Sequence, residues 1–124
     1  MRMPRHQFEA LVREALDSLP EEFMGYMENL SVEVQDAPAP ELAARMGLEH
    51  PSDLMGVYTG VPLTEKSVEA LVDWPEQIVV FQKNIERACR TRDEMIEEIR
   101  ITVLHEIAHH FGLDEDDLGE LGYR

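Results

Sequence analysis

The sequence is poor in cysteine, in basic residues and in long apolar runs. Its single cysteine, Cys89, excludes an intramolecular disulfide and a zinc cluster built from cysteines. No stretch approaches the roughly 18 consecutive apolar residues that suggest a membrane span. The first residues, MRMPRHQF, lack the apolar segment of a signal peptide. We therefore expect a soluble protein of the reducing cytoplasm, with no membrane partner.

Acidic residues greatly outnumber basic ones. The chain has 11 Lys and Arg against 26 Asp and Glu, and a formal net charge of −15. Proteins that bind nucleic acids use basic side chains to displace counterions from phosphates, so nucleic acid is not an expected partner. A solvated acidic surface is enough to explain most of the charge, although such a field would also favour a divalent cation.

The length and the composition fit one domain that spans residues 1–124. Hydrophobic residues make up 44% of the chain, which is enough for a single core. There are no internal repeats and no low-complexity linker. Residues 4–19 have apolar side chains at helical spacing, and a second short helix is expected after Pro20. Residues 92–111 show the same helical spacing and form the longest predicted helix.

Alternating or continuous apolar residues predict the strands. The expected strands cover residues 30–35, 53–63 and 77–85. Gly56 and Gly60 indicate a bulge or a close approach of another segment in the middle strand. Short helices are expected at 40–47, where Gly47 is the terminator, and at 115–121, with a helical turn near 68–72. The order of elements predicts an α+β fold, with a small three- to four-stranded mixed sheet packed on the long helix.

The long helix carries the pattern H-E-x-x-H at His105, Glu106 and His109. Residues four apart lie one turn apart on the same helix face, so both imidazoles can bind one metal ion. Zinc accepts imidazole nitrogen and leaves a position open for water when the protein supplies three ligands. Glu106 is displaced by about 100° around the axis, so it is placed to act as general base on that water. Apolar neighbours suggest that the two imidazoles lie near the core.

A third ligand must come from the acidic tail or from an earlier segment. In one common arrangement the ligand is a Glu some twenty residues further on, but only fifteen residues follow His109. In another, the helix ends at a glycine and the ligand follows three residues later, and here Gly112 and Glu115 hold those positions. Asp114 is the alternative, but it is also a natural N-cap for residues 115–121. We predict Zn²⁺ bound by His105, His109 and Glu115.

The stretch VLHEIAHHFGLDEDDLGELGY, together with GVYTGVPLTEKSV and PEQIVVFQKNIE upstream, resembles the small bacterial zincin-like proteins called minimal metallopeptidases. Their pattern has the form H-E-x-x-H-x-x-G-x-x-D, and this chain has Glu115 in place of the last Asp. The resemblance extends from Phe8 onward. It implies a compact zincin-like domain, a metal held by two histidines and an acidic residue, and catalysis by Glu106. It suggests peptidase chemistry without implying a substrate; a peptide or protein is the substrate that we expect.

Other residues have weaker patterns. His110 and Tyr123 could contact a substrate or the metal site, but a partly exposed histidine and a core-covering tyrosine are ordinary alternatives. Thr102 could support the metal ligands from the same helix face, but a position that faces solvent is the expectation. Residues 78–83 could be an edge strand that pairs with an extended substrate, although the continuous apolar run also fits a central strand.

Two other functions fit the same motif. One is a zinc-binding domain without peptidase activity, in which Asp114, Asp116 or Asp117 closes the metal site as a fourth ligand. The other is a metal-dependent hydrolase that acts on a substrate other than a peptide.

Overall fold

The computed structural model describes residues 2–25, 27, 30–45, 47, 50–59 and 76–110. In chain order the elements are α1 (Arg5–Asp17), α2 (Glu21–Met24), β1 (Leu30–Gln35), α3 (Pro40–Arg45), the 3-10 turn η1 (Pro51–Asp53), β2 (Gly56–Thr59), β3 (Glu76–Phe81), α4 (Gln82–Ala88) and α5 (Arg92–His110). The predicted turn at 68–72 and the predicted helix at 115–121 lie outside the described residues. Gly47 follows α3 with φ of 76°, as expected for a residue that ends a helix.

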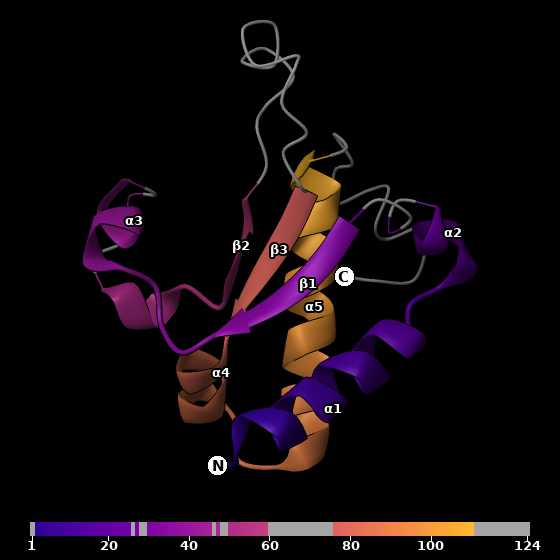
Figure 1. Cartoon of the computed structure of the whole chain (residues 1–124), viewed down its shortest axis with the longest axis horizontal. Coiled ribbons are helices and arrows are strands. Elements are labelled where there is room, and N and C mark those ends of the chain that lie inside the picture. The colour runs from indigo at the N-terminus through magenta and orange to yellow at the C-terminus, as the bar shows by residue number, and fades with distance from the viewer. Residues whose placement is uncertain are drawn as a thin grey trace, which may run out of the picture.

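The three strands form one mixed sheet in the order β1-β3-β2. Strand β1 runs parallel to β3, with Leu30 opposite Glu76 and Gln35 opposite Phe81. Strand β2 runs antiparallel to β3, with Gly56 opposite Val80. Because β3 has a neighbour on each side, it is the central strand (Figure 1). The central position that the continuous apolar run favours is confirmed, and the alternative of an edge strand at residues 78–83 is excluded.

The sheet has apolar side chains on both of its faces, which explains the continuous apolar run of β3. Ile78 and Val80 are buried in the larger cluster, together with residues of α1 and α5. Val79 and Phe81 are buried on the opposite face, where they pack with Leu54 in a smaller cluster. A strand that is buried on both faces needs apolar residues at every position rather than at alternate ones.

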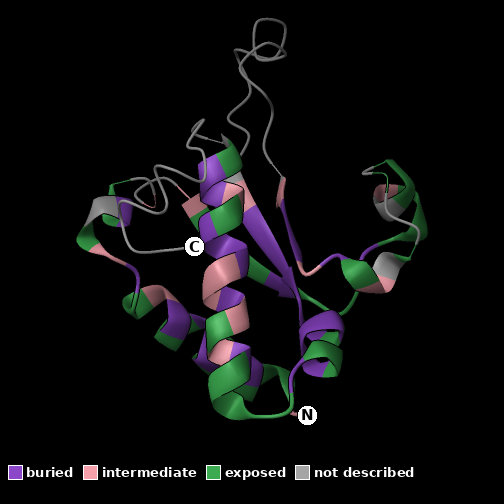
Figure 2. Cartoon of the chain, turned by 180° about the vertical axis from the view of Figure 1, so that it is seen from behind, coloured by how far each residue is buried: buried purple, intermediate pink, exposed green. Residues whose placement is uncertain are grey.

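Helices α1 and α5 pack together on the larger cluster's side of the sheet, while α3 lies apart from them on the other side of β2 (Figure 1). Helix α1 buries Phe8, Leu11, Val12 and Ala15, which recur at the three- and four-residue spacing of one helix face. Seen from behind, buried and exposed residues alternate along α5, as in a helix with one face on the core (Figure 2). The predicted α+β architecture, with a small mixed sheet on a long helix, is confirmed.

Strand β3 is shorter than predicted. The sequence predicts a single strand over residues 77–85, but the chain is extended only to Phe81, and α4 begins at Gln82. Two polar side chains fix this transition. The amide of Gln82 donates to the carbonyl oxygen of Met3 at 2.9 Å, and the amide of Asn84 donates to that of Leu54 at 2.7 Å. Both partners are distant in sequence, so local patterns could not indicate this helix.

Within the described ranges, the chain forms no helix that is both long enough and apolar enough to cross a membrane.

Candidate metal centre

Helix α5 presents the H-E-x-x-H residues, and its start is set by a capping arrangement. The hydroxyl of Thr91 accepts a hydrogen bond from the backbone N–H of Glu94 at 3.1 Å. The carboxylate of Glu94 in turn accepts from the backbone N–H of Arg90 at 3.1 Å. These bonds satisfy N–H groups that have no partner inside the helix, and they fix where α5 begins. The helix then continues for 19 residues to His110.

The buried face of α5 determines how the motif residues point. Met95, Ile99, Val103 and Ile107 recur every four residues and are almost fully buried. Each turn of an α-helix takes 3.6 residues, so His105 lies about 200° around the axis from Val103. Both His105 and His109 are therefore exposed, and the side chain of His109 keeps 80% of its accessible surface. The expectation that the two imidazoles lie near the core is wrong.

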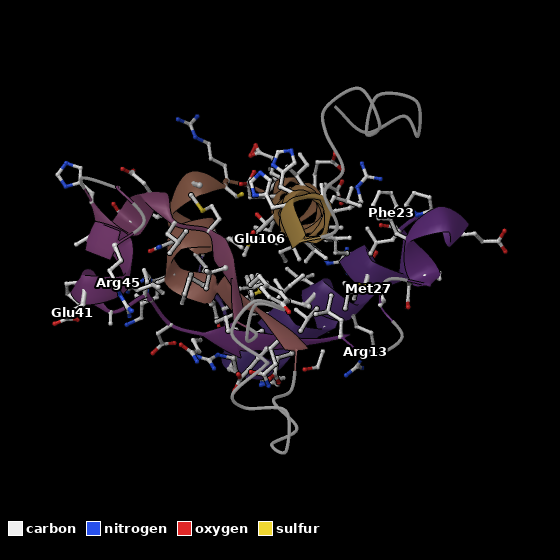
Figure 3. The ribbon with its side chains drawn as sticks, turned by 90° about the horizontal axis from the view of Figure 1, so that it is seen from above. Arg13, Phe23, Met27, Glu41, Arg45 and Glu106 are labelled. Atoms are coloured by element: carbon white, nitrogen blue, oxygen red, sulfur yellow. The ribbon has the colours of Figure 1, made fainter. Side chains whose placement is uncertain are left out.

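Glu106 occupies an intermediate position between the core and the solvent. Its side chain is only 15% exposed, and one carboxylate oxygen lies 3.9 Å from Nδ1 of His109. Burial raises the pKa of the Glu106 carboxyl above its usual value, and the nearby His109 opposes that shift. Figure 3 looks along α5 and shows Glu106 on its flank, with Phe23 of α2 on the other side. The carboxylate is thus partly shielded beside an open pair of histidines.

Strand β2 comes very close to α5 one turn before the motif. A β-carbon built on Gly56 would lie 2.5 Å from the Cγ2 methyl of Thr102 and 3.0 Å from the carbonyl oxygen of Val79. The predicted close approach at Gly56 is thereby confirmed. Thr102 is 8% exposed, so the expectation that it faces solvent is wrong. The contact matters for the site, because Thr102 precedes Glu106 by four residues.

The chemistry of the described donors fits zinc. Two exposed imidazoles one turn apart on a helix can converge on one ion, and imidazole nitrogen is a preferred zinc donor. Within the described residues, His, Cys, Asp and Glu side chains form no group of three that could hold a metal. The predicted third ligand Glu115 and its alternative Asp114 lie outside the described residues. The same is true of Tyr123 and of the side chain of His110.

Three comparisons relate the chain to known proteins. A family model described as zincin-like metallopeptidase matches residues 27–123. A solved structure of a conserved hypothetical protein from Thermus thermophilus has 22% sequence identity and a TM-score of 0.55, over 88% of this chain and 94% of that one. At this identity the likeness concerns the fold alone. The comparison with curated proteins gave no match.

Proposed function

Because this chain belongs to the family of zincin-like metallopeptidases, we propose that it is a zinc-dependent peptidase with its reaction centre at the C-terminal end of α5. The observation that carries the proposal is the arrangement of three side chains. His105 and His109 are exposed one turn apart, while Glu106 is largely buried at 3.9 Å from His109. Open donors next to a shielded carboxylate suit hydrolysis better than a purely structural role.

In this proposal the zinc ion is held by His105, His109 and Glu115. The exposure of both imidazoles supports the assignment, because their nitrogens are accessible to an ion from solvent. Bound zinc would supply a Lewis acid that polarises a carbonyl and makes water more acidic. Glu115 is proposed from the spacing after Gly112, and it stays a prediction.

Glu106 is the proposed general base. One of its carboxylate oxygens takes a proton from the attacking water and later delivers it to the nitrogen of the leaving amine. A base must lie within reach of the water while bulk solvent is partly kept away, and its 15% exposure is consistent with both conditions. The buried residues on its own helix fix the position of its backbone against the core.

The proposed substrate is a peptide or protein in extended form. Strand β3 is central and cannot take another strand, so the candidate edges are those of β1 and β2. We favour β2, because Gly56 brings this strand against Thr102, one turn from Glu106. A peptide paired with β2 would add main-chain hydrogen bonds to the sheet and pass close to the motif.

The proposed setting is the cytoplasm. Cys89 is the single cysteine of the chain and its thiol is buried, which is an ordinary state of cysteine in a reducing compartment. A measurement of where a tagged full-length chain accumulates in the cell, compared with one cytoplasmic and one secreted marker, tests this assignment.

The test separates metal binding from catalysis. Zinc content is measured by atomic emission for the wild type, Glu106→Gln and the control Glu98→Gln, which removes the same charge two turns earlier on α5. We expect one zinc per chain in all three. Cleavage of a peptide library is expected for the wild type and the control, and a loss of about 10²-fold or more is expected for Glu106→Gln.

Each outcome decides between functions. A wild type that binds no zinc overturns the metal centre. Zinc binding without cleavage of any peptide, and without hydrolysis of simple esters, indicates the metal-binding domain instead. Ester hydrolysis without peptide cleavage indicates a hydrolase with another substrate. Equal cleavage by wild type and Glu106→Gln removes Glu106 from the reaction.

A further inference from the structure

A hollow lies far from the motif, between the residues that lead into α1 and the helix α4. It has a volume of about 710 Å³, within the ~300–1,000 Å³ range of small-molecule sites. Its charged lining consists of Arg2, Arg5, Lys83 and Arg87 with Asp36 and Glu86. Basic side chains outnumber acidic ones here, although over the whole chain acidic residues prevail by 26 to 11. The hollow therefore has an excess of basic side chains, whereas the chain as a whole is acidic.

The floor of this hollow is held in place by hydrogen bonds between distant segments. The side chain of Gln82 accepts from Nε of Arg5 at 2.7 Å and donates to the carbonyl oxygen of Met3 at 2.9 Å. The same amide donates to Glu86 at 3.0 Å, and Glu86 also accepts from the backbone N–H of Met3 at 3.0 Å. Gln82 is 5% exposed and Glu86 is 9% exposed. The floor is thus buried and ordered before any ligand arrives.

The basic side chains around the hollow differ in whether they pair with other protein groups. The guanidinium of Arg5 is committed to protein partners, since it pairs with Asp36 and donates to the carbonyl oxygen of Val34 at 3.0 Å. In contrast, Arg2, Lys83 and Arg87 form no ion pair with any other residue that the structure describes. All three are exposed at the rim. These three positive charges repel each other, and an anion bound between them would reduce that repulsion.

We propose that this hollow is a binding site for a small oxyanion, such as a phosphorylated or polycarboxylate metabolite. Arginine presents a planar fork of N–H groups that matches phosphate and carboxylate oxygens, and lysine adds a compact charge. Among the described residues that line the hollow, Met3 is the only apolar one, so a hydrophobic ligand would gain little there. Asp36 and Glu86 are held by Arg5, Gln82 and Met3, so they leave the rim cations available.

The site is separate from the candidate metal centre. Helix α4 ends just before the N-terminal end of α5, whereas His105 and His109 lie at the other end of that helix (Figure 1). A helix of 19 residues is about 28 Å long. The oxyanion is therefore a second ligand and not the group that is hydrolysed beside Glu106.

The test is calorimetric titration of the full chain with inorganic pyrophosphate and, separately, with citrate, at constant ionic strength in NaCl. The variant Lys83→Gln/Arg87→Gln removes two rim charges that have no ion-pair partner among the described residues. The control Arg13→Gln/Arg45→Gln removes two exposed charges elsewhere, on α1 and α3 (Figure 3). We expect saturable binding by the wild type and by the control, and an affinity at least about tenfold lower for the rim variant.

Tighter binding of pyrophosphate than of citrate would assign the site to phosphate groups, and the reverse order would assign it to carboxylates. The absence of saturable binding to either probe overturns the proposal. So does an equal loss in the rim variant and the control, because that would indicate a general effect of net charge. Pyrophosphate and citrate also bind zinc, so the titration is repeated with His105→Ala, which removes a proposed zinc ligand. Binding that this variant retains is independent of the proposed peptidase function, and loss of binding in this variant overturns the proposal.

Discussion

The contact between Gly56 and Thr102 allows a sharp test of how β2 sits on α5. Replacing Gly56 with alanine would put a carbon 2.5 Å from the methyl carbon of Thr102 and 3.0 Å from the carbonyl oxygen of Val79. Carbon atoms in contact prefer about 3.5–4.0 Å, so the overlap with the methyl is about 1 Å. Thr102 cannot avoid it easily, because a β-branched side chain on a helix has few rotamers.

The expected cost follows from this overlap. Overpacking of a buried site destabilises a protein by about 1–3 kcal/mol. Alanine also leaves the unfolded chain less conformational freedom than glycine does, and this offsets about 0.4–1 kcal/mol of the cost. We therefore expect Gly56→Ala to lower the free energy of unfolding by about 1–2 kcal/mol, and the melting temperature by several degrees.

A second substitution isolates the cause. Thr102→Ser removes the methyl that the new carbon meets and should cost about 1 kcal/mol by itself, because a buried methyl is lost. In the double variant the alanine carbon occupies the space that the methyl leaves. The two effects should then be non-additive by about 1 kcal/mol or more in the stabilising direction, with the tight contact to the oxygen of Val79 remaining.

The assay is urea unfolding followed by circular dichroism for the wild type, both single variants and the double variant. Gly25→Ala is the control, since a β-carbon there meets nothing within 4 Å and φ is −62°. It should be neutral or slightly stabilising. Additive effects of Gly56→Ala and Thr102→Ser, within about 0.5 kcal/mol, would refute the close packing of β2 on α5.

Three further predictions concern the core, the thiol and the metal. Asn84→Leu should lower the free energy of unfolding by about 1–3 kcal/mol, measured by urea unfolding, because it leaves the carbonyl oxygen of Leu54 without its 2.7 Å donor. Burial, and then the charge of Glu98, raise the pKa of Cys89 above 9.0. The neutral thiol is favoured in the fold, so the stability it contributes is present below pH 9.0 and is lost as the pH rises through the folded pKa. Cys89→Ala should flatten the melting temperature against pH in that range. A chelator should lower the melting temperature of the wild type, because it removes a metal that stabilises the folded chain. It should leave that of His105→Ala unchanged, because this variant has lost a metal ligand and has no bound metal to lose.

Local patterns predicted most helices and strands, because the spacing of apolar side chains within each of these segments matches its secondary structure. Helices α1 and α5 have apolar side chains at helical spacing, and β1 alternates apolar and polar residues. Helix α4 is not predicted, because its polar first residues follow an apolar strand without a turn signal. Gln82 and Asn84 are buried there only because Met3 and Leu54, which are distant in the sequence, accept their hydrogen bonds.

The candidate site also has one feature that the sequence predicts and one that depends on tertiary packing. The spacing of His105, Glu106 and His109 determines that the two imidazoles share one helix face, because this depends only on the 3.6-residue repeat. Which way that face points depends on the opposite side of α5. Ile99, Val103 and Ile107 pack into the core, and the histidines are consequently exposed.

By itself the sequence determined most of the helices and strands and the metal-binding pattern, because each of these depends on neighbours along the chain. The tertiary structure alone decided that β3 is central, that Thr102 is the group packed against Gly56, and that Met3 and Glu86 meet across 83 positions to form the basic hollow. Contacts of that range arise from the packing of whole elements around one core, and the cost of closing such long loops is offset only when many contacts form together.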